Sequence, residues 1–243
     1  MRNLNSMLRF LLGCIIFIIM VSFSFKKMDT MNCITQNINI ENTDFITEYL
    51  VIDFLKEKSL FPENLTFSNI SFQKIESSLD NHDHIDKVKV YCDILGNIQI
   101  DIIPKEPIIR VINGDDSFYL DDKGEYMKTS SFYTARLPVV SGDIDNIDQE
   151  DLFVISNYIY NDNFLKKYIV QIEILDDRLF LFTRSGNVKR IEFGRIENIE
   201  DKFKKLRKYF EHMRFYDRDY DTINLEYRDQ ILCKKIYNNE KYK

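Results

Sequence analysis

The chain has 243 residues, of which 44% are hydrophobic and 30% are charged, so it has room for one or two globular domains. Its formal net charge is −6, which argues against nucleic acid as the main partner, because nucleic-acid-binding proteins usually carry a basic surface. Seven glycines leave little material for a phosphate-binding loop, and neither GxGxxG nor GxxxxGK[ST] occurs. Four cysteines and three histidines contain no CxxC pair, so a zinc site with several ligands is not expected.

An apolar segment lies at the N-terminus. Residues 7–25 read MLRFLLGCIIFIIMVSFSF, with no charge between Phe10 and Phe25. A helix over this range is roughly 28 Å long, close to a bilayer hydrocarbon core of about 30 Å. A cleaved signal peptide is the alternative, but no A-x-A-like site follows, and Lys26 and Lys27 come directly after the apolar run. We interpret residues 7–25 as an uncleaved signal anchor after a short start at residues 1–6.

The expected orientation of this anchor rests on the size of the part of the chain that follows it and not on the distribution of basic residues. Basic residues are about equally distributed on its two sides, so the positive-inside rule does not decide. The large C-terminal part is expected to lie outside the cytoplasm. That part holds Cys33, Cys92 and Cys233, an odd number that leaves at least one thiol free in an oxidising compartment. Cys92 lies in an alternating apolar segment, which favours a small buried side chain, and the disulfide state is left open.

The segment after the anchor predicts the element order β-α-α-β-β. Apolar residues repeat at helical spacing in two stretches and alternate in the flanking ones. Asn42 or Thr43 can cap the first helix, with Asp44 in its first turn, and residues 62–69 are interpreted as a connection. The predicted strands cover residues 33–40, 85–92 and 98–102, and the predicted helices cover residues 44–56 and 71–79.

The following block is dominated by predicted strands, with two helices between them. The helices are expected at residues 148–160 and 199–212, the first of them with acidic residues in its first turn. The predicted strands cover residues 107–112, 118–120, 139–140, 169–175, 179–183, 188–193 and 221–227. Together the elements indicate an α+β protein: one N-terminal transmembrane helix, a β-α-α-β-β module and a mixed β-sheet domain with helices.

The second of these helices carries a run of basic residues. Its apolar residues share one face, and the basic run falls largely on the opposite face. We interpret the basic face as solvent-exposed; contact with anionic headgroups or with a partner is the alternative. The basic residues are Lys202, Lys204, Lys205, Arg207 and Lys208.

Motifs for chemistry are weak throughout the sequence. Ser71 to Lys74 match SxxK, but the accompanying KTG element is missing. His82 and His84 flank Asp83 without a third histidine or a cysteine nearby, so loop polarity explains them better than a metal. Paired carboxylates such as Asp121-Asp122 sit beside predicted turns, which explain them without acid–base catalysis. We predict no catalytic residue, no metal site, no cofactor and no small-molecule substrate.

Several segments, in order, resemble the bacterial cell-division family FtsQ/DivIB in its Bacteroidetes form. Residues 74–112 resemble the end of the family's POTRA domain and the entry to its β domain, with P-x-x-R at residues 107–110. YLDDKGEYM at residues 119–127 resembles the family's Y-x-D-x-x-G-x-x-M stretch. LPVVSG (137–142), IEFGRIENIEDKFKKLRKYF (191–210) and INLEYRDQILCKK (223–235) also fit. Asn224 and Glu226 depart from the pattern, since many members have Asp and Arg there.

The resemblance implies a non-catalytic divisome scaffold in the inner membrane, with its C-terminal bulk in the periplasm at the division septum. Such a protein binds FtsB- and FtsL-like single-pass proteins and other divisome components, and links early division proteins to septal peptidoglycan synthesis. The implied domains are a POTRA-like domain at residues 26–105, a β domain at residues 106–236 and a flexible tail at residues 237–243. Another membrane-anchored POTRA-like assembly or transport factor is the alternative; an anchored hydrolase would need a nucleophile–base pair, which is not visible.

In this family, partner capture runs through the last strand of the β domain. An edge strand offers unpaired N–H and C=O groups, and its alternate side chains give specificity. By position, this role falls to Tyr227, Asp229, Gln230, Ile231 and Leu232. The competing interpretation makes Ile231 and Leu232 ordinary core residues.

Overall fold

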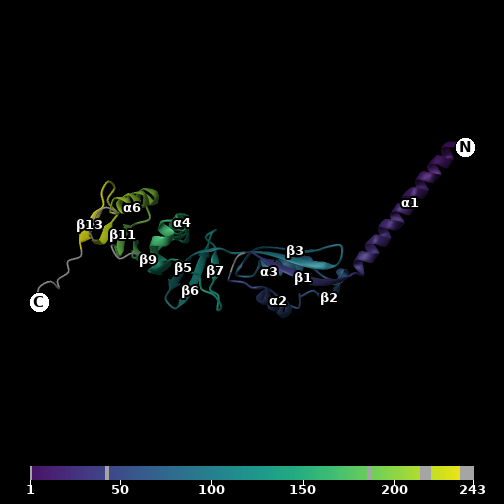
Figure 1. The fold of residues 1–243 in the computed structure, drawn as a ribbon, viewed down its shortest axis with the longest axis horizontal. Coiled ribbons are helices and arrows are strands. Elements are labelled where there is room, and N and C mark those ends of the chain that lie inside the picture. The colour runs from purple at the N-terminus through teal and green to yellow at the C-terminus, as the bar shows by residue number, and fades with distance from the viewer. Residues whose placement is uncertain (1, 42–43, 185–187, 214–219, 236–243) are drawn as a thin grey trace. The chain divides into compact units, whose positions relative to one another are not determined.

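The computed structural model describes residues 2–41, 44–184, 188–213 and 220–235. The chain divides into two compact units, Met1–Pro104 and Lys105–Lys243 (Figure 1). The predicted fold class is confirmed: an N-terminal apolar helix is followed by a POTRA-like β/α module and then by a mixed sheet with helices. The predicted tail at residues 237–243 lies outside the described residues.

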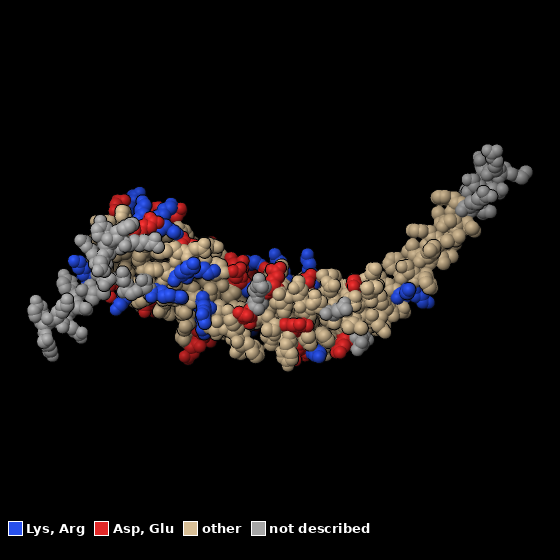
Figure 2. All heavy atoms as spheres, viewed as in Figure 1, with Lys and Arg blue, Asp and Glu red and all other residues tan. Residues whose placement is uncertain are grey.

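The first unit begins with helix α1, Arg2–Asp29. Its segment Phe10–Asp29 has a mean hydropathy of 2.0 and is unburied, so its length and composition suffice to cross a membrane. Figure 2 shows an uncharged surface along the described part of this helix up to basic side chains near its end. The helix continues beyond the apolar run, and the Thr30 hydroxyl donates to the carbonyl oxygen of Lys26 at 3.2 Å.

A four-stranded sheet forms the rest of this unit. Its strand order is β2-β1-β4-β3, in which β1 and β4 are parallel and the other neighbours antiparallel. Isoleucines 98, 100 and 102 of β4 are buried against Leu55 of α2 and Leu79 of α3, so both helices pack on one face. The elements are β1 Asn32–Ile40, α2 Glu48–Glu57, β2 Glu63–Thr66, the 3-10 helix Phe67–Asn69, α3 Phe72–Asp80, β3 Ile85–Cys92 and β4 Asn97–Pro104.

Two sequence-based details of this module are wrong. Helix α2 is capped by Thr47, whose hydroxyl accepts from Leu50 N at 3.4 Å, and not at Asn42 or Thr43, which lie outside the described residues. Phe45 is buried, but it lies in the segment before the helix. Its spacing from the apolar residues of α2 therefore suggested, wrongly, that the helix has an additional N-terminal turn. The predicted connection 62–69 contains β2, a four-residue edge strand too short to show clear alternation.

The second unit is built on a nine-stranded sheet of order β13-β12-β11-β10-β9-β8-β5-β6-β7. Pairs β5–β8, β8–β9 and β11–β12 are parallel and the remaining pairs antiparallel. The strands are β5 Pro107–Asn113, β6 Asp116–Asp121, β7 Tyr126–Lys128, β8 Val139–Gly142, β9 Ile169–Leu175, β10 Arg178–Thr183, β11 Arg190–Gly194, β12 Tyr220–Asn224 and β13 Leu232–Lys235. The helices are the 3-10 helix Ile144–Asn146, α4 Gln149–Asn161, α5 Leu165–Tyr168 and α6 Ile199–Met213.

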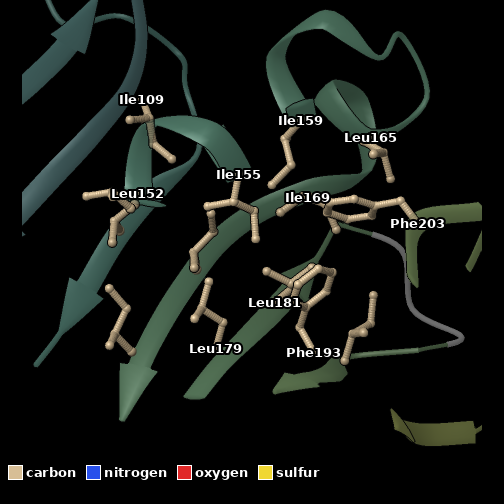
Figure 3. Packing of buried hydrophobic residues seen from close by; sticks show 14 of the residues in the cluster. Ile109, Leu152, Ile155, Ile159, Leu165, Ile169, Leu179, Leu181, Phe193 and Phe203 are labelled. Carbon is tan, nitrogen blue, oxygen red and sulfur yellow. The ribbon is translucent and has the colours of Figure 1, made fainter. Parts of the chain in front are cut away.

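The core of this unit lies between the helices and one face of the sheet (Figure 3). Ile155 and Ile159 of α4 point toward Leu179 and Leu181 of β10, and Phe203 of α6 packs against Phe193 with ring centroids 5.0 Å apart. Burial along β9 and β10, which were predicted as strands at residues 169–175 and 179–183, follows a period of two over most of their length.

The sequence missed the short elements of this unit. Strands β7 and β13 and helix α5 have three or four residues each, and strand β12 ends at Asn224 instead of reaching Tyr227. Such short segments offer too few residues for a periodic pattern. The strand predicted for residues 221–227 and the segment after it therefore form two antiparallel strands joined by a loop.

Candidate partner-binding edge

Strand β13 is the terminal strand of the nine-stranded sheet. It pairs antiparallel with β12, with Cys233 opposite Ile223 and Leu232 opposite Asn224. All four residues of β13 are exposed, although the Cys233 side chain also contacts Tyr209 of α6. An edge strand of this kind presents backbone N–H and C=O groups on its outer side.

The five predicted site residues lie together, but mostly beside the strand instead of in it. Tyr227, Asp229 and Gln230 are exposed in the connection between β12 and β13. Ile231 is half-buried and packs against the core of the unit, whereas Leu232 opens β13 with 45% of its surface exposed. All five residues belong to one segment, residues 227–232, and of the five only Leu232 lies in β13.

Helix α6 holds the start of this segment through a lysine. The Lys205 ammonium donates to the carbonyl oxygen of Leu225 at 2.9 Å and also to that of Tyr227. Burial lowers the pKa of Lys205 below its ordinary value. The sequence assigned Lys205 to a solvent-exposed face and missed this role; the only signal was its position within a basic run.

Lys202 contradicts the same interpretation more strongly, because its side chain is buried. Its ammonium lies 4.8 Å from the Phe193 ring centroid and donates to the Arg195 carbonyl oxygen at 2.7 Å. A long methylene stem can cross an apolar surface while the charged head reaches an acceptor. Lys204, by contrast, is exposed and forms an ion pair with Glu200 one turn away.

Polar contacts also fix the end of β12. Asn224 Nδ2 donates to Glu192 Oε2 at 2.7 Å, and Asn224 Oδ1 accepts from the backbone N–H of Glu226 at 2.9 Å. The Glu226 carboxylate forms an ion pair with Arg178. At both of these positions the sequence departs from the family pattern, and here Asn224 and Glu226 make contacts of their own that orient the chain leaving β12.

A groove separates α6 from the segment that leads into β13. One part of it has a volume of about 570 Å³ and is lined by Lys204, Lys205, Lys208, Arg228 and Asp229, among others. An adjoining part of about 390 Å³ shares three of these residues and is also lined by Tyr209, His212, Gln230 and Ile231. Three of the predicted site residues therefore line a concave surface next to the open strand edge.

The histidines and carboxylates that were considered for metal binding or catalysis take part in ring packing and in turn hydrogen bonds. His82 stacks edge-on against Phe54 with ring centroids 5.0 Å apart, and His84 stacks on Phe45 at 5.8 Å. Among the described residues no group of three or more His, Cys, Asp or Glu could hold a metal ion. The buried Asp121 carboxylate accepts from the N–H groups of Lys123 at 3.0 Å and Glu125 at 2.7 Å, which is turn chemistry.

The fold and the open edge define a class: an α+β protein with an N-terminal apolar helix, a POTRA-like domain and a β domain. The family model described as "FtsQ/DivIB, C-terminal related" matches residues 106–234, and the model for a POTRA-like domain matches residues 31–103. The chain belongs to the FtsQ/DivIB family, a family of division-related scaffolds. No curated protein matches it.

Proposed function

We propose that this protein is a non-catalytic, membrane-anchored divisome scaffold that captures FtsB- and FtsL-like single-pass proteins. The observation that carries the proposal is strand β13, a sheet edge whose four residues are all exposed. A partner segment in extended conformation can add to this edge, because main-chain hydrogen bonds supply affinity and alternate side chains supply specificity. Family membership supports the division-related role.

Residues 227–232 would form the side of this interface next to α6. Tyr227 and Leu232 offer exposed apolar surface, the kind of residue that lies at the core of interfaces. Asp229 and Gln230 would supply polar contacts from the wall of the groove. Lys205 would act indirectly, by holding the backbone of Leu225 and Tyr227 in place.

The proposal places helix α1 in the inner membrane, through residues 7–25, and both folded units in the periplasm at the division septum. The long uncharged stretch of α1 and the basic residues at its end support anchoring. From this position the protein would link early division proteins to septal peptidoglycan synthesis. The proposed domain limits remain residues 26–105 for the POTRA-like domain and 106–236 for the β domain.

The test is affinity capture of tagged full-length protein from its own membranes, with identification of the co-purifying chains. Leu232→Asp places a charge on the open edge. Leu175→Asp is the matched control, because Leu175 is 40% exposed in β9 of the same unit, remote in strand order from β13. A chain truncated after Glu226 removes the whole segment.

FtsB- and FtsL-like proteins should be recovered with the unmodified chain and with Leu175→Asp. Their recovery should fall at least tenfold with Leu232→Asp and with the truncated chain, because a charge buried without a partner is strongly unfavourable. Equal recovery with all variants would move the interface away from β13. Absence of these proteins from every sample, with folding verified by circular dichroism, would reject the divisome proposal and favour the assembly-factor alternative.

A further inference from the structure

The turn between β3 and β4 carries two large apolar side chains at its tip. Ile94 is 94% exposed and Leu95 is 75% exposed. Turn positions usually hold Gly, Pro, Asn, Asp or Ser, which suit both the backbone and water. Two adjacent apolar residues displayed in this way need an explanation that single exposed ones do not.

Hydrogen bonds make this turn rigid. Asp93 Oδ1 accepts from the N–H groups of Leu95 at 2.8 Å and Asn97 at 2.9 Å, and the N–H of Gly96 donates to the Asp93 carbonyl oxygen at 3.2 Å. Hydrogen bonds to the Asp93 carboxyl group, mainly those from Asn97, lower its pKa and so favour the ionised form that accepts them. The backbone therefore holds Ile94 and Leu95 outward in a defined place.

The turn contacts the chain where α1 passes into β1. A Cβ added at Gly96 would lie 2.6 Å from the Asn32 carbonyl oxygen, and the N–H of Ile34 donates to the Gly96 carbonyl oxygen at 2.9 Å. Figure 1 shows the turn after β3 next to this point. The tip of the hairpin is thus joined, through Asn32 and Ile34, to the segment that directly follows α1.

Chain length limits how far this point can lie from the apolar end of α1. Met31 follows Phe25 by six residues, and its N–H donates to the Met28 carbonyl oxygen at 3.1 Å, so the chain stays wound up to that residue. At about 1.5–2 Å per residue, Met31 lies roughly 10 Å beyond Phe25. That distance is comparable to the headgroup layer of about 5–8 Å on each side of a bilayer.

Other exposed apolar side chains gather at the same end of the unit. Ile34 hydrogen-bonds to Gly96, Leu65 is paired with Cys33 in the neighbouring strand, and Met28 lies in the last turn of α1; all three are exposed. With Ile94 and Leu95 they form an apolar end of the POTRA-like domain beside the apolar helix.

We infer that Ile94 and Leu95 insert into the boundary between headgroups and acyl chains of the membrane that α1 crosses. The turn is then a second membrane contact, which keeps the POTRA-like domain close to the bilayer surface. Lys26 and Lys27, which directly follow the apolar run of α1, are suited to anionic headgroups. This inference rests on the membrane anchoring proposed above.

The test uses the absence of tryptophan from the chain. A single introduced tryptophan is a unique fluorophore, and acyl-chain-brominated lipids quench it when it enters the membrane. The full-length protein is reconstituted into vesicles of phosphatidylethanolamine and phosphatidylglycerol carrying such lipids. The reporter is Leu95→Trp, with Ile94→Trp as a second variant in case one fails to fold. Tyr49→Trp, at a position 72% exposed on α2, is the water-facing control, and Phe17→Trp reports on α1 itself.

We expect Leu95→Trp and Ile94→Trp to be quenched and blue-shifted, while Tyr49→Trp keeps the emission of a water-exposed indole. If Phe17→Trp is quenched but both turn variants behave like Tyr49→Trp, the anchor stands and the inference is rejected. If Phe17→Trp is also unquenched, the membrane anchoring fails and the inference falls with it. The two failures are therefore distinguishable.

Discussion

The ammonium group of Lys205 lies 2.9 Å from the carbonyl oxygen of Leu225, a hydrogen bond that ties helix α6 to the segment entering edge strand β13. Leu225 is buried, and the exposed residues of the candidate interface begin two positions later, at Tyr227. The position of the loop is therefore determined by a side chain remote in sequence.

Lys205→Met keeps most of the methylene stem and removes the donor to the Leu225 and Tyr227 carbonyl oxygens. Hydrogen bonds to charged groups contribute about 1.5–3 kcal/mol, so residues 225–231 should exchange their amide hydrogens at least tenfold faster. Recovery of the partner proteins should fall in parallel. Hydrogen exchange with mass spectrometry measures the first effect and affinity capture the second.

Lys204→Met is the control for this variant, because Lys204 pairs with Glu200 on the exposed side of α6. Such a pair contributes about 0.3–0.5 kcal/mol, so little change is expected. Equal exchange in the two variants would show that Lys205 does not hold the loop.

Gly142→Ala should strongly destabilise the second unit. Gly142 has φ +102°, and an added Cβ would lie 2.1 Å from the Ile174 carbonyl oxygen in the adjoining strand. Strain and displacement of the strand together should lower the free energy of unfolding by about 3 kcal/mol or more. Chemical denaturation of the full-length protein in detergent measures the loss.

Gly114→Ala is the matched comparison for Gly142→Ala. Gly114 has φ +60°, but no atom lies within 4 Å of an added Cβ. Only the left-handed backbone conformation then opposes alanine, at about 1–2 kcal/mol. Similar losses in both variants would mean that the close approach to Ile174 is unimportant.

Cys92 should become reactive only at high pH. Burial, and then a contact of 3.7 Å with the Cys33 sulfur, raise the pKa of the Cys92 thiol from 9.0 to about 11. The thiolate is the reactive form, so alkylation by iodoacetamide should reach half of its maximal rate near pH 11 in the folded protein and near pH 9 in the denatured protein. Peptide mass spectrometry measures both rates.

The same shift affects stability. Because the folded state binds this proton more tightly, the contribution of Cys92 is fully present below pH 9 and is lost as the pH rises toward 11. Cys92→Ala should therefore remove part of the decline in the free energy of unfolding between pH 9 and 11. Identical slopes for the variant and the unmodified chain would contradict the assignment.

Leu181→Ala should cost about 2–5 kcal/mol of the free energy of unfolding of the second unit, because it opens a cavity between β10 and α4 (Figure 3). Leu175→Ala, at the exposed end of β9, should change it by no more than about 0.5 kcal/mol. Denaturation of both variants under the same conditions provides the test. A small effect at Leu181 would place the core elsewhere.

Longer elements were predictable because their patterns repeat several times. Alternation in β3 and β4 and the helical spacing in α6 identified the buried faces correctly. Strands β2, β7 and β13 were missed because three or four residues do not establish a period. The late start of α2 was missed because Phe45 is buried in an extended segment, which its apolar spacing cannot reveal.

The candidate site was predicted only as a stretch of chain. Its residues, from Tyr227 to Leu232, were identified by resemblance, but the sequence did not show that Leu232 starts a separate edge strand. Lys202 and Lys205 were interpreted as solvent-exposed, since helical periodicity distinguishes faces and cannot tell which lysine reaches a carbonyl group.

The sequence by itself determined the apolar N-terminal helix, the α+β class and the alternation of buried and exposed side chains along the longer strands, because these depend on residues close together in the chain. Only the tertiary structure decided that β13 ends the sheet, that Lys205 supports its loop, and that the turn carrying Ile94 and Leu95 contacts the start of β1. Each of these features depends on which distant segments pair. Pairing is determined by the free energy of the whole packed sheet, and local periodicity does not encode it.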